Sequence, residues 1–323
     1  MQHAPEIAVV IPCYRARERV LDVLARIGAE CGAIYVVDDA CPEGSGAHVE
    51  AHCRDTRVRV LRHAVNQGVG GATLTGYEAA LAGGAGVLVK LDADGQMDPA
   101  LIPTLVAPIL GGEADYTKGN RFFDLEGVRA MPLVRLLGNS ALSFLSKLSS
   151  GYWDLFDPTN GFTALHAAVA RRLPVAKLSR RWFFESDLLF RLGTLRAVVV
   201  DVPMAAVYGD EASSLVVWRV LPEFAWKHLV NTAKRLFYGY YLRDFSFASL
   251  ELVLGALLMA GGAWFGLDRW RAGSLSGVSQ SSGTVMLAAL PVLLGVQLVL
   301  GFLAHDMHNA PRQVIHRRLA PPR

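Results

Sequence analysis

Two aspartates stand one residue apart directly after a run of strand-forming residues, in the segment VLVKLDADGQMDP. Side chains of residues i and i+2 at a strand end project to the same side, so Asp92 and Asp94 can share one ligand. Two such carboxylates can hold a hard divalent cation, Mg²⁺ or Mn²⁺, beside a diphosphate, and Gln96 can add a neutral oxygen. A D-x-D sequence alone is also compatible with capping of a helix that begins near Pro99, so both interpretations stay open at this point.

A second acidic pair, Asp38 and Asp39, ends an earlier apolar run. Strand-like runs alternate with helical segments here, and the strand candidates are residues 6–12, 33–39, 58–63, 86–92 and 114–120. This βαβ rhythm predicts an α/β fold with a mostly parallel sheet covered on both faces. Because ligands of such sheets bind outside the carboxyl ends of the strands, we expect both acidic pairs to face one crevice.

Two arginines, Arg121 and Arg135, follow the fifth strand candidate, and Lys118 stands just before them within it. Such a cluster could clamp phosphate groups, since a guanidinium forms paired hydrogen bonds to phosphate oxygens; solvated surface charge is the alternative. Asp187 lies among apolar neighbours in FFESDLLFRL and is therefore either paired or catalytic. Asp157 in FDPTNGF can cap a turn through its side chain.

Several ligand classes fit the sequence poorly. The glycine run NQGVGGATLTG lacks the third small position of a dinucleotide fingerprint, and its acidic strand end precedes the glycines, so we set NAD aside. These glycines instead indicate a tight entry to a helix, with Asn66 positioned by the turn. The four cysteines have no C-x-x-C spacing, which argues against a disulfide scaffold and against zinc. A net charge of +3 gives no electrostatic case for nucleic acid.

The chain is too apolar on average to consist of soluble domains alone, with 52% hydrophobic residues and a mean hydropathy of +0.30. The apolar excess lies in the C-terminal part. Residues 245–267 carry a single charge, Glu251, and residues 272–304 carry none, so each stretch can span a hydrocarbon core of about 30 Å. The preceding segment 222–245 has an apolar and a basic face, which is typical of a helix in the membrane interface; a packed amphipathic helix is the alternative. We therefore expect two transmembrane helices.

Basic residues flank the two spans more densely than they occupy the loop between them. They are Lys227, Lys234, Arg235 and Arg243 before the spans, Arg269 and Arg271 between them, and Arg312, Arg317, Arg318 and Arg323 after them. This pattern predicts a multi-pass protein of the inner (plasma) membrane with both termini cytoplasmic. The N-terminal apolar run is broken at Pro12 without a basic leader, so we expect the catalytic part to stay in the cytosol. The expected segments are a catalytic domain (1–214), interfacial helices (215–244), a two-helix anchor (245–304) and a basic tail (305–323).

In chain order, the motifs VVIPCY, VVDDAC, NQGVGGA, LDADGQ, KGNRF, DPTNGF and VPM resemble the family 2 glycosyltransferases. Within them, the resemblance is to the polyprenyl-phosphate group, which includes dolichyl-phosphate mannosyltransferases and bactoprenol glucosyltransferases. It covers residues 7–214, and the two spans resemble those of membrane-anchored bacterial members. The resemblance implies a GT-A fold, a nucleotide-sugar donor, a Mg²⁺ or Mn²⁺ ion, and inverting transfer of a sugar to a polyprenyl phosphate lipid.

The resemblance also assigns roles by position. It places Asp92, Asp94 and Gln96 at the metal and diphosphate. It places Pro12, Tyr14, Asp38, Asp39, Asn66 and Asp92 around the nucleotide sugar, Arg121 and Arg135 at phosphates of donor or acceptor, and Asp187 on the acceptor side. Two departures leave the sugar and the exact acceptor open: Arg15-Ala16 replaces the family's Asn-Glu, and YGDEASSL lacks the basic residues that follow VPM in the family.

Chemistry supports the same assignment, because a bound metal stabilises the charge that develops on a leaving diphosphate. A phosphate acceptor is already largely anionic at neutral pH and needs little help from a base such as Asp187. One alternative is transfer to a glycolipid or polysaccharide, although LSRRW has Leu178 where processive synthases carry glutamine. Another is a non-catalytic nucleotide-sugar-binding membrane protein, against which both aspartates argue. The sequence leaves the oligomeric state open, a homo-oligomer included.

Overall fold

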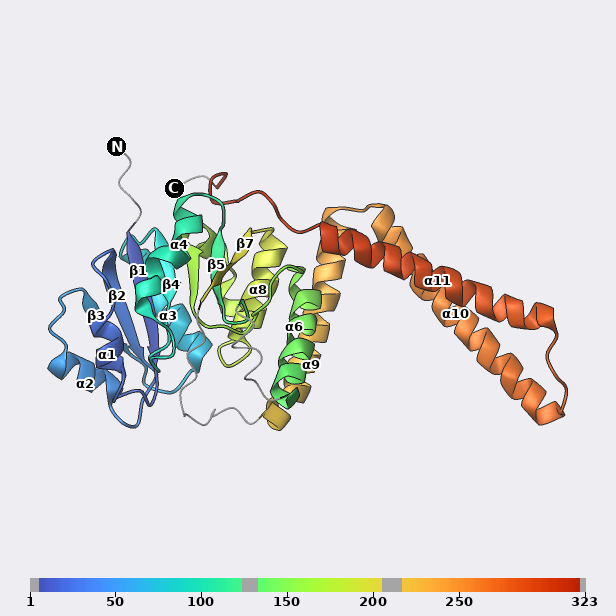
Figure 1. The fold of residues 1–323 in the computed structure, drawn as a ribbon, viewed down its shortest axis with the longest axis horizontal. Coiled ribbons are helices and arrows are strands. Elements are labelled where there is room, and N and C mark those ends of the chain that lie inside the picture. Colours follow the sequence, from blue (N-terminus) through green and yellow to red (C-terminus); the bar gives the residue numbers. More distant parts are fainter. Residues whose placement is uncertain (1–5, 124–132, 205–216, 320–323) are drawn as a thin grey trace. The chain divides into compact units, whose positions relative to one another are not determined.

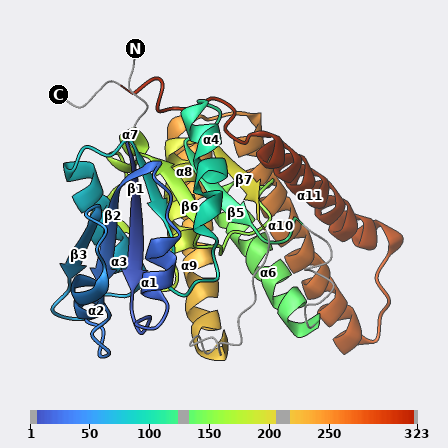
Figure 2. The same cartoon turned by 60° about the vertical axis from the view of Figure 1, so that its left-hand side comes forward.

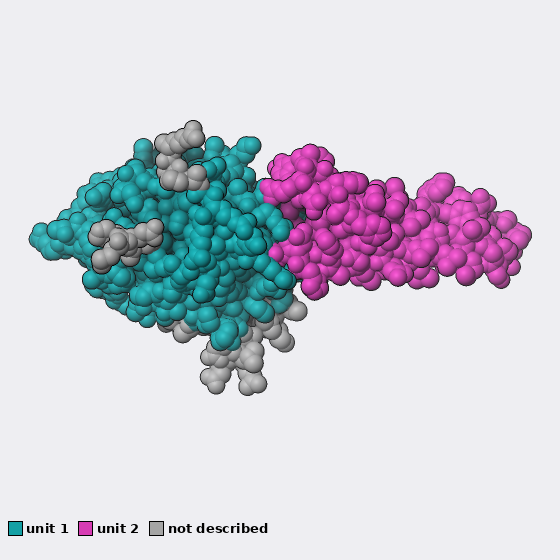
Figure 3. Space-filling model, turned by 90° about the horizontal axis from the view of Figure 1, so that it is seen from above, with its two compact units in different colours: residues 1–232, 311–323 teal, residues 233–310 magenta. Residues whose placement is uncertain are grey.

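The computed structural model describes residues 6–123, 133–204 and 217–319. The chain divides into two compact units (Figure 3), one of residues 1–232 with 311–323 and one of residues 233–310. We call them unit 1 and unit 2. The boundaries expected at residues 214, 244 and 304 remain predictions.

Unit 1 contains a seven-stranded sheet in the order β3-β2-β1-β4-β6-β5-β7 (Figures 1 and 2). The strands are β1 (Ile7–Cys13), β2 (Cys31–Asp38), β3 (Val58–Arg62), β4 (Val87–Lys90), β5 (Tyr116–Asn120), β6 (Thr163–His166) and β7 (Val199–Pro203). Only β6 runs antiparallel to its neighbours, β4 and β5. The mostly parallel sheet and all five expected strands are confirmed, and the sequence interpretation missed β6 and β7.

Helices cover both faces of the sheet, as the alternation of buried residues along β1 requires. Val9 and Ile11 point to a core shared with helices α1 (Val20–Ala25), α2 (Ser45–His52) and α4 (Ile102–Leu110). Ala8 and Val10 point to the opposite core, shared with helices α3 (Val69–Ala82) and α8 (Phe184–Leu195). The other helical elements of unit 1 are η1 (Pro99–Leu101), α6 (Leu133–Ser150), α7 (Ala167–Ala170), η2 (Val175–Lys177) and most of α9 (Val217–Phe237).

The C-terminal segment belongs to unit 1 and binds one buried carboxylate at the amino end of β5. Asp115 has a side chain that is 0% exposed, and it accepts hydrogen bonds from the backbone N–H groups of Val198, Ile315 and His316. The His316 ring lies 2.7 Å from the same carboxylate and stacks on His166, with 4.2 Å between the ring centroids. Residues 315–319 are therefore part of the packed structure of unit 1.

Unit 2 consists mainly of a π-helical turn, η3 (Tyr238–Arg243), and two long helices, α10 (Phe247–Ser276) and α11 (Ser282–His308). Both long helices have the length and composition to cross a membrane, with mean hydropathies of 1.7 and 2.3 over their most apolar windows. Only 11% of each window is buried, unlike the core helix of a soluble protein. The two helices approach closely at glycines, since a Cβ on Gly295 would lie 2.7 Å from the Gly255 carbonyl oxygen.

The helix boundaries differ from the apolar stretches expected in the sequence. Residues 272–276 belong to α10, and α11 starts only at Ser282. The break falls at Gly277, which has φ = 70°, a backbone conformation that favours glycine. Hydropathy alone places the second span too early, because it does not register where glycine and serine end a helix.

Candidate active site

The first acidic pair lies in the loop that follows β4, at the carboxyl end of the sheet. Asp92 has a side chain that is 29% exposed and accepts a hydrogen bond from Lys90 Nζ at 2.8 Å. The Asp94 carboxylate accepts one from the Gln96 backbone N–H at 3.0 Å, and the Asp94 carbonyl accepts one from Arg19. The loop thus presents two partly exposed carboxylates two residues apart. Because β4 ends at Lys90 and Asp94 lies in a turn, the expectation that both side chains project to the same side stays a prediction.

A second loop presses directly against Asp92. A Cβ added to Gly161 would lie 2.5 Å from Asp92 Oδ2 and 2.6 Å from Lys90 Nζ, and real Cβ atoms essentially never approach other atoms so closely. Glycine is therefore required in DPTNGF because the LDADGQ loop occupies the space of a side chain. The two motifs, about seventy residues apart in the chain, form one packed structure.

Replacing Gly161 by alanine is expected to displace Asp92 and to weaken nucleotide binding in the presence of Mn²⁺, with a packing cost of about 1–3 kcal/mol in stability. Titration calorimetry and thermal melting of the purified protein measure the two effects. Gly138→Ala is the matched control, because a Cβ at that position in α6 meets no atom within 4 Å. Unchanged nucleotide affinity in the Gly161 variant would contradict this account of the contact.

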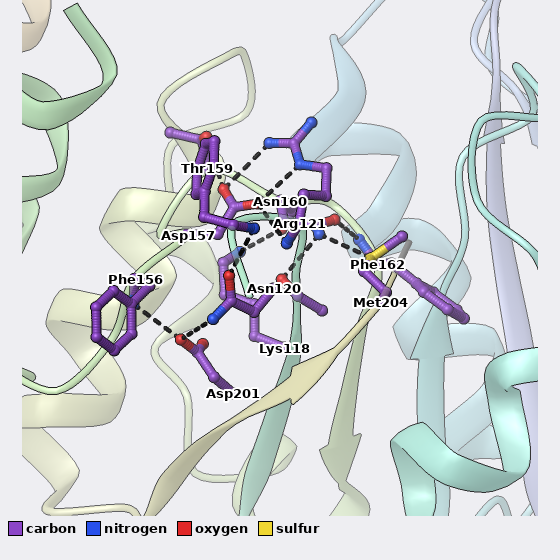
Figure 4. A network of polar contacts seen from close by, with 12 residues as sticks. Lys118, Asn120, Arg121, Phe156, Asp157, Thr159, Asn160, Phe162, Asp201 and Met204 are labelled. Atoms are coloured by element: carbon purple, nitrogen blue, oxygen red, sulfur yellow. Dashed lines mark hydrogen bonds and ion pairs between the residues drawn. The ribbon is translucent and has the colours of Figure 1, made fainter. Parts of the chain in front are cut away.

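The same loop binds the arginine of KGNRF (Figure 4). Asp157 has a side chain that is 0% exposed, and it accepts hydrogen bonds from Arg121 Nε at 2.7 Å and Nη2 at 3.1 Å. Lys118 Nζ donates to the Asn160 carbonyl, and Asn160 Nδ2 donates to the Gly119 carbonyl at 2.8 Å. Complete burial lowers the pKa of Lys118 to about 8. Residues 157–161 thus connect β5 and Arg121 on one side with Asp92 on the other.

The second acidic pair has a different environment from the first. The Asp38 carboxylate is 6% exposed and accepts from the backbone N–H groups of Cys41 and Gly46, both at 2.7 Å. Asp39 is 2% exposed and accepts from the N–H groups of Gln67 and Gly68, both at 2.8 Å. These carboxylates hold the two loops that follow β2 and β3.

The remaining expected nucleotide-site residues lie on the same part of the sheet edge. Asn66 donates to the Asp39 carbonyl at 3.2 Å, Pro12 lies in β1 opposite Val37, and Tyr14 follows β1 with a side chain that is 45% exposed. The structure therefore brings all of them to the carboxyl ends of β1 and β2, next to β4. Their contact with a nucleotide stays a prediction.

Asp187 is paired. It is 4% exposed and accepts hydrogen bonds from the Ser179 N–H at 2.9 Å and from Arg191 and Asn231 at 3.3 Å each. These contacts tie α8 to the preceding loop and to α9, which is how a buried structural acid is satisfied. Arg135 lies in helix α6, but its side chain is outside the described part of the structure. The predicted roles of both residues remain untested.

Comparison with known proteins identifies the family. The Glycosyl transferase family 2 model matches residues 8–173, which include both acidic pairs and the 157–161 loop. The chain belongs to glycosyl transferase family 2. Its fold is similar to that of glucosyl-3-phosphoglycerate synthase from Mycobacterium tuberculosis in complex with Mn²⁺, UDP and glucosyl-3-phosphoglycerate. The TM-score is 0.52, with 19% identity over 72% of this chain and 80% of that chain.

Two relatives of this family 2 enzyme have names that state an acceptor. Polyprenol monophosphomannose synthase from Mycolicibacterium smegmatis is 31% identical over 61% of this chain and 75% of its own. Undecaprenyl-phosphate mannosyltransferase from Micrococcus luteus is 30% identical over 62% of this chain and 83% of its own. The suspected family is thereby confirmed.

The metal-binding side chains of this family 2 site fit a divalent metal that is held jointly with substrate phosphates. Within residues 6–123, 133–204 and 217–319, no group of three or more His, Cys, Asp or Glu side chains is arranged to enclose an ion. Mg²⁺ typically binds through one or two carboxylates together with substrate phosphates. Two partly exposed carboxylates in a fixed loop meet that requirement when diphosphate oxygens complete the coordination.

Sequence reasoning assigned no role to Lys90, to Asn160 or to Glu185, whose Oε1 lies 3.2 Å from Lys90 Nζ. Lys90 was detectable, because a lysine inside an apolar strand with an aspartate at i+2 indicates a buried ion pair. Asp157 was recognised only as a turn residue, since its partner lies 36 positions away and no periodicity connects them.

Proposed function

We propose that this protein transfers a sugar, with inversion at the anomeric carbon, from a nucleotide-sugar donor to a polyprenyl phosphate at the cytosolic face of the membrane. The observation that carries the proposal is the 157–161 loop. It contacts Asp92 through Gly161 and binds Arg121 through Asp157. One short, mostly buried segment thus contacts both Asp92, a carboxylate expected on the donor side, and an arginine suited to phosphate.

Asp92 and Asp94 would hold Mg²⁺ or Mn²⁺ together with the donor diphosphate, with the Gln96 side chain as a further oxygen ligand. The metal supplies charge stabilisation on the diphosphate as it leaves. The loops held by Asp38 and Asp39 would line the nucleoside, with Pro12, Tyr14 and Asn66. Because each carboxylate accepts hydrogen bonds from two backbone N–H groups, and Asp39 also contacts the His63 ring at 2.7 Å, we assign them to shaping these loops.

Arg121 would orient the acceptor phosphate while Asp157 fixes its guanidinium plane, and Arg135 would supply a second guanidinium. A phosphate monoester carries at least one negative charge at pH 7, so it can attack without a general base. This assigns no proton transfer to Asp187, in agreement with its three hydrogen bonds.

The membrane placement rests on α10 and α11, which would cross the bilayer as a hairpin. Because residues 1–232 and 311–323 belong to the same unit, both ends of the hairpin would lie on one side of the bilayer. The excess of basic residues at these ends makes that side cytoplasmic. Trp226 and Leu229 of α9 are 65% and 60% exposed, as expected of a helix that faces the membrane interface.

The acceptor is tested by the chemistry of the product. Membranes that contain the protein, incubated with a panel of radiolabelled nucleotide sugars, are expected to yield a product that is extractable into organic solvent and labile to mild acid. Arg135→Lys is expected to lose most of the rate, because one ammonium cannot form paired hydrogen bonds to phosphate. An acid-stable product with parent-like activity in Arg135→Lys would contradict the proposal and favour a glycolipid or polysaccharide acceptor.

A further inference from the structure

Lys90 is a fully buried cation next to Asp92, one of the two carboxylates assigned to the metal and the donor diphosphate. Its side chain is 1% exposed, and its ammonium group has three acceptors: Asp92 Oδ1 at 2.8 Å, Glu185 Oε1 at 3.2 Å and the Gly161 carbonyl at 3.4 Å. An ammonium has three N–H donors, so each has a partner. Lys90 therefore has a defined position relative to Asp92 and cannot reach solvent or a ligand itself.

Glu185 supplies the second negative charge from another element, the first turn of α8. The ammonium charge of this buried lysine is thus balanced by two carboxylates at hydrogen-bond distance. Of the three charged groups, Asp92 is the most exposed, at 29% against 13% for Glu185 and 1% for Lys90.

The neighbouring buried lysine makes the contrast clear. Lys90 and Lys118 both pair with Thr163 across β6, so the two side chains lie on the same face of the sheet in one row. Within the described part of the chain, Lys118 has no carboxylate within 4 Å, and its ammonium donates instead to the Asn160 carbonyl. Holding the 157–161 loop thus does not require a carboxylate partner. The ion pair to Asp92 is an additional feature of Lys90.

We infer that Lys90 and Glu185 are positioning residues, which orient the Asp92 carboxylate for a divalent metal and the donor diphosphate. The inference rests on the proposed function. Lys90 holds Oδ1 of Asp92 and thereby fixes the carboxylate plane, so that Oδ2 faces the Gly161 side of the loop. Glu185 forms a second ion pair with the same ammonium. Because Lys90 compensates two carboxylates, it does not neutralise the charge of Asp92 completely. Carboxylates that ligate metals are commonly held by such outer hydrogen bonds, and losing one costs about 10–100-fold in metal affinity.

The decisive variant removes both partners together. Lys90→Met with Glu185→Leu leaves the net charge around Asp92 and Asp94 unchanged, and a buried ion pair replaced by apolar side chains often keeps its stability. The full-length protein in detergent is titrated with Mn²⁺ in the presence of UDP or GDP, whichever the parent binds. We expect the dissociation constant for Mn²⁺ to rise about tenfold or more while the melting temperature stays close to that of the parent.

The matched control is Arg62→Met with Glu50→Leu, which likewise replaces an ion pair by apolar side chains. The side chains of this pair are about half exposed, and its removal should not change the affinity for Mn²⁺. If the first double variant does not fold, Lys90→Gln with Glu185→Gln keeps polar atoms in place and carries the same expectation. Parent-like Mn²⁺ affinity in a folded double variant overturns the inference and leaves the proposed function intact. A parent that binds neither nucleotide with Mn²⁺ overturns both.

Discussion

Asp94→Asn is expected to lower the rate of sugar transfer about 10³-fold, the range found when one group that stabilises transition-state charge is removed. Asp94 is a cleaner target than Asp92, because Asp92 also neutralises Lys90. An asparagine at position 94 retains an Oδ1 that can accept the Gln96 N–H, so the loop should keep its conformation. The loss should therefore arise from the missing charge at the metal.

Initial rates across a range of Mn²⁺ concentrations, with thermal melting of the same preparations, measure this effect. EDTA should reproduce it in the parent protein. Asp98→Asn is the matched control in the same loop, since Asp98 pairs with Arg26 at 2.6 Å on the surface and should be dispensable for transfer. An Asp94→Asn variant that, in metal-depleted buffer, transfers sugar as fast as the parent does with Mn²⁺ would be incompatible with a metal at this pair.

Arg121→Lys is expected to lower both stability and activity. Asp157 is fully buried, and Arg121 is its ion-pair partner among the described residues, through two guanidinium nitrogens. A lysine provides one ammonium in place of the fork, so the carboxylate loses part of its hydrogen bonding. Breaking a buried ion pair costs about 3 kcal/mol or more in unfolding free energy. We expect a loss of that order in denaturant unfolding and a transfer rate reduced at least about a hundredfold.

A double variant separates the two contributions. Arg121→Met with Asp157→Leu removes the buried charge together with its partner and should regain most of the lost stability. If Arg121 orients a phosphate, the double variant should stay inactive despite its restored fold. Arg172→Lys, at an exposed position, controls for the substitution itself. Recovery of both stability and transfer in the double variant would show that Arg121 serves the fold alone.

The fold could be predicted from the sequence wherever a repeating pattern reports burial. β1, β2 and β4 are short apolar runs between turn residues, and their parallel arrangement follows from the helices between them. β6 was missed because its four residues, TALH, follow directly on DPTNGF and form no apolar run between turn residues. Its antiparallel direction comes from pairing with β4 and β5, and such long-range pairing leaves no local signal.

The candidate site could be predicted only in part. The carboxylates at the ends of β2 and β4 were found, because a parallel sheet brings its carboxyl ends to one edge. Their partners were not, since hydrogen bonds such as those of Asp39 to Gln67 and Gly68 span 28 and 29 positions. Motif order indicated which residues belong to the site. Only the packing distinguishes the partly exposed pair, Asp92 and Asp94, from the buried pair, Asp38 and Asp39, which accepts hydrogen bonds from backbone N–H groups.

The contact between Asp115 and residues 315–316 has a consequence for biosynthesis. Besides Val198, the partners of this carboxylate lie 200 and 201 positions further along the chain, beyond both α10 and α11. They are synthesised only after both helices, and until then the part of the Asp115 carboxylate that they bind has to stay hydrated. Since domains generally begin to fold during synthesis, unit 1 would assemble its sheet early but close this corner last. Completion of unit 1 is thereby timed to follow translation of α10 and α11.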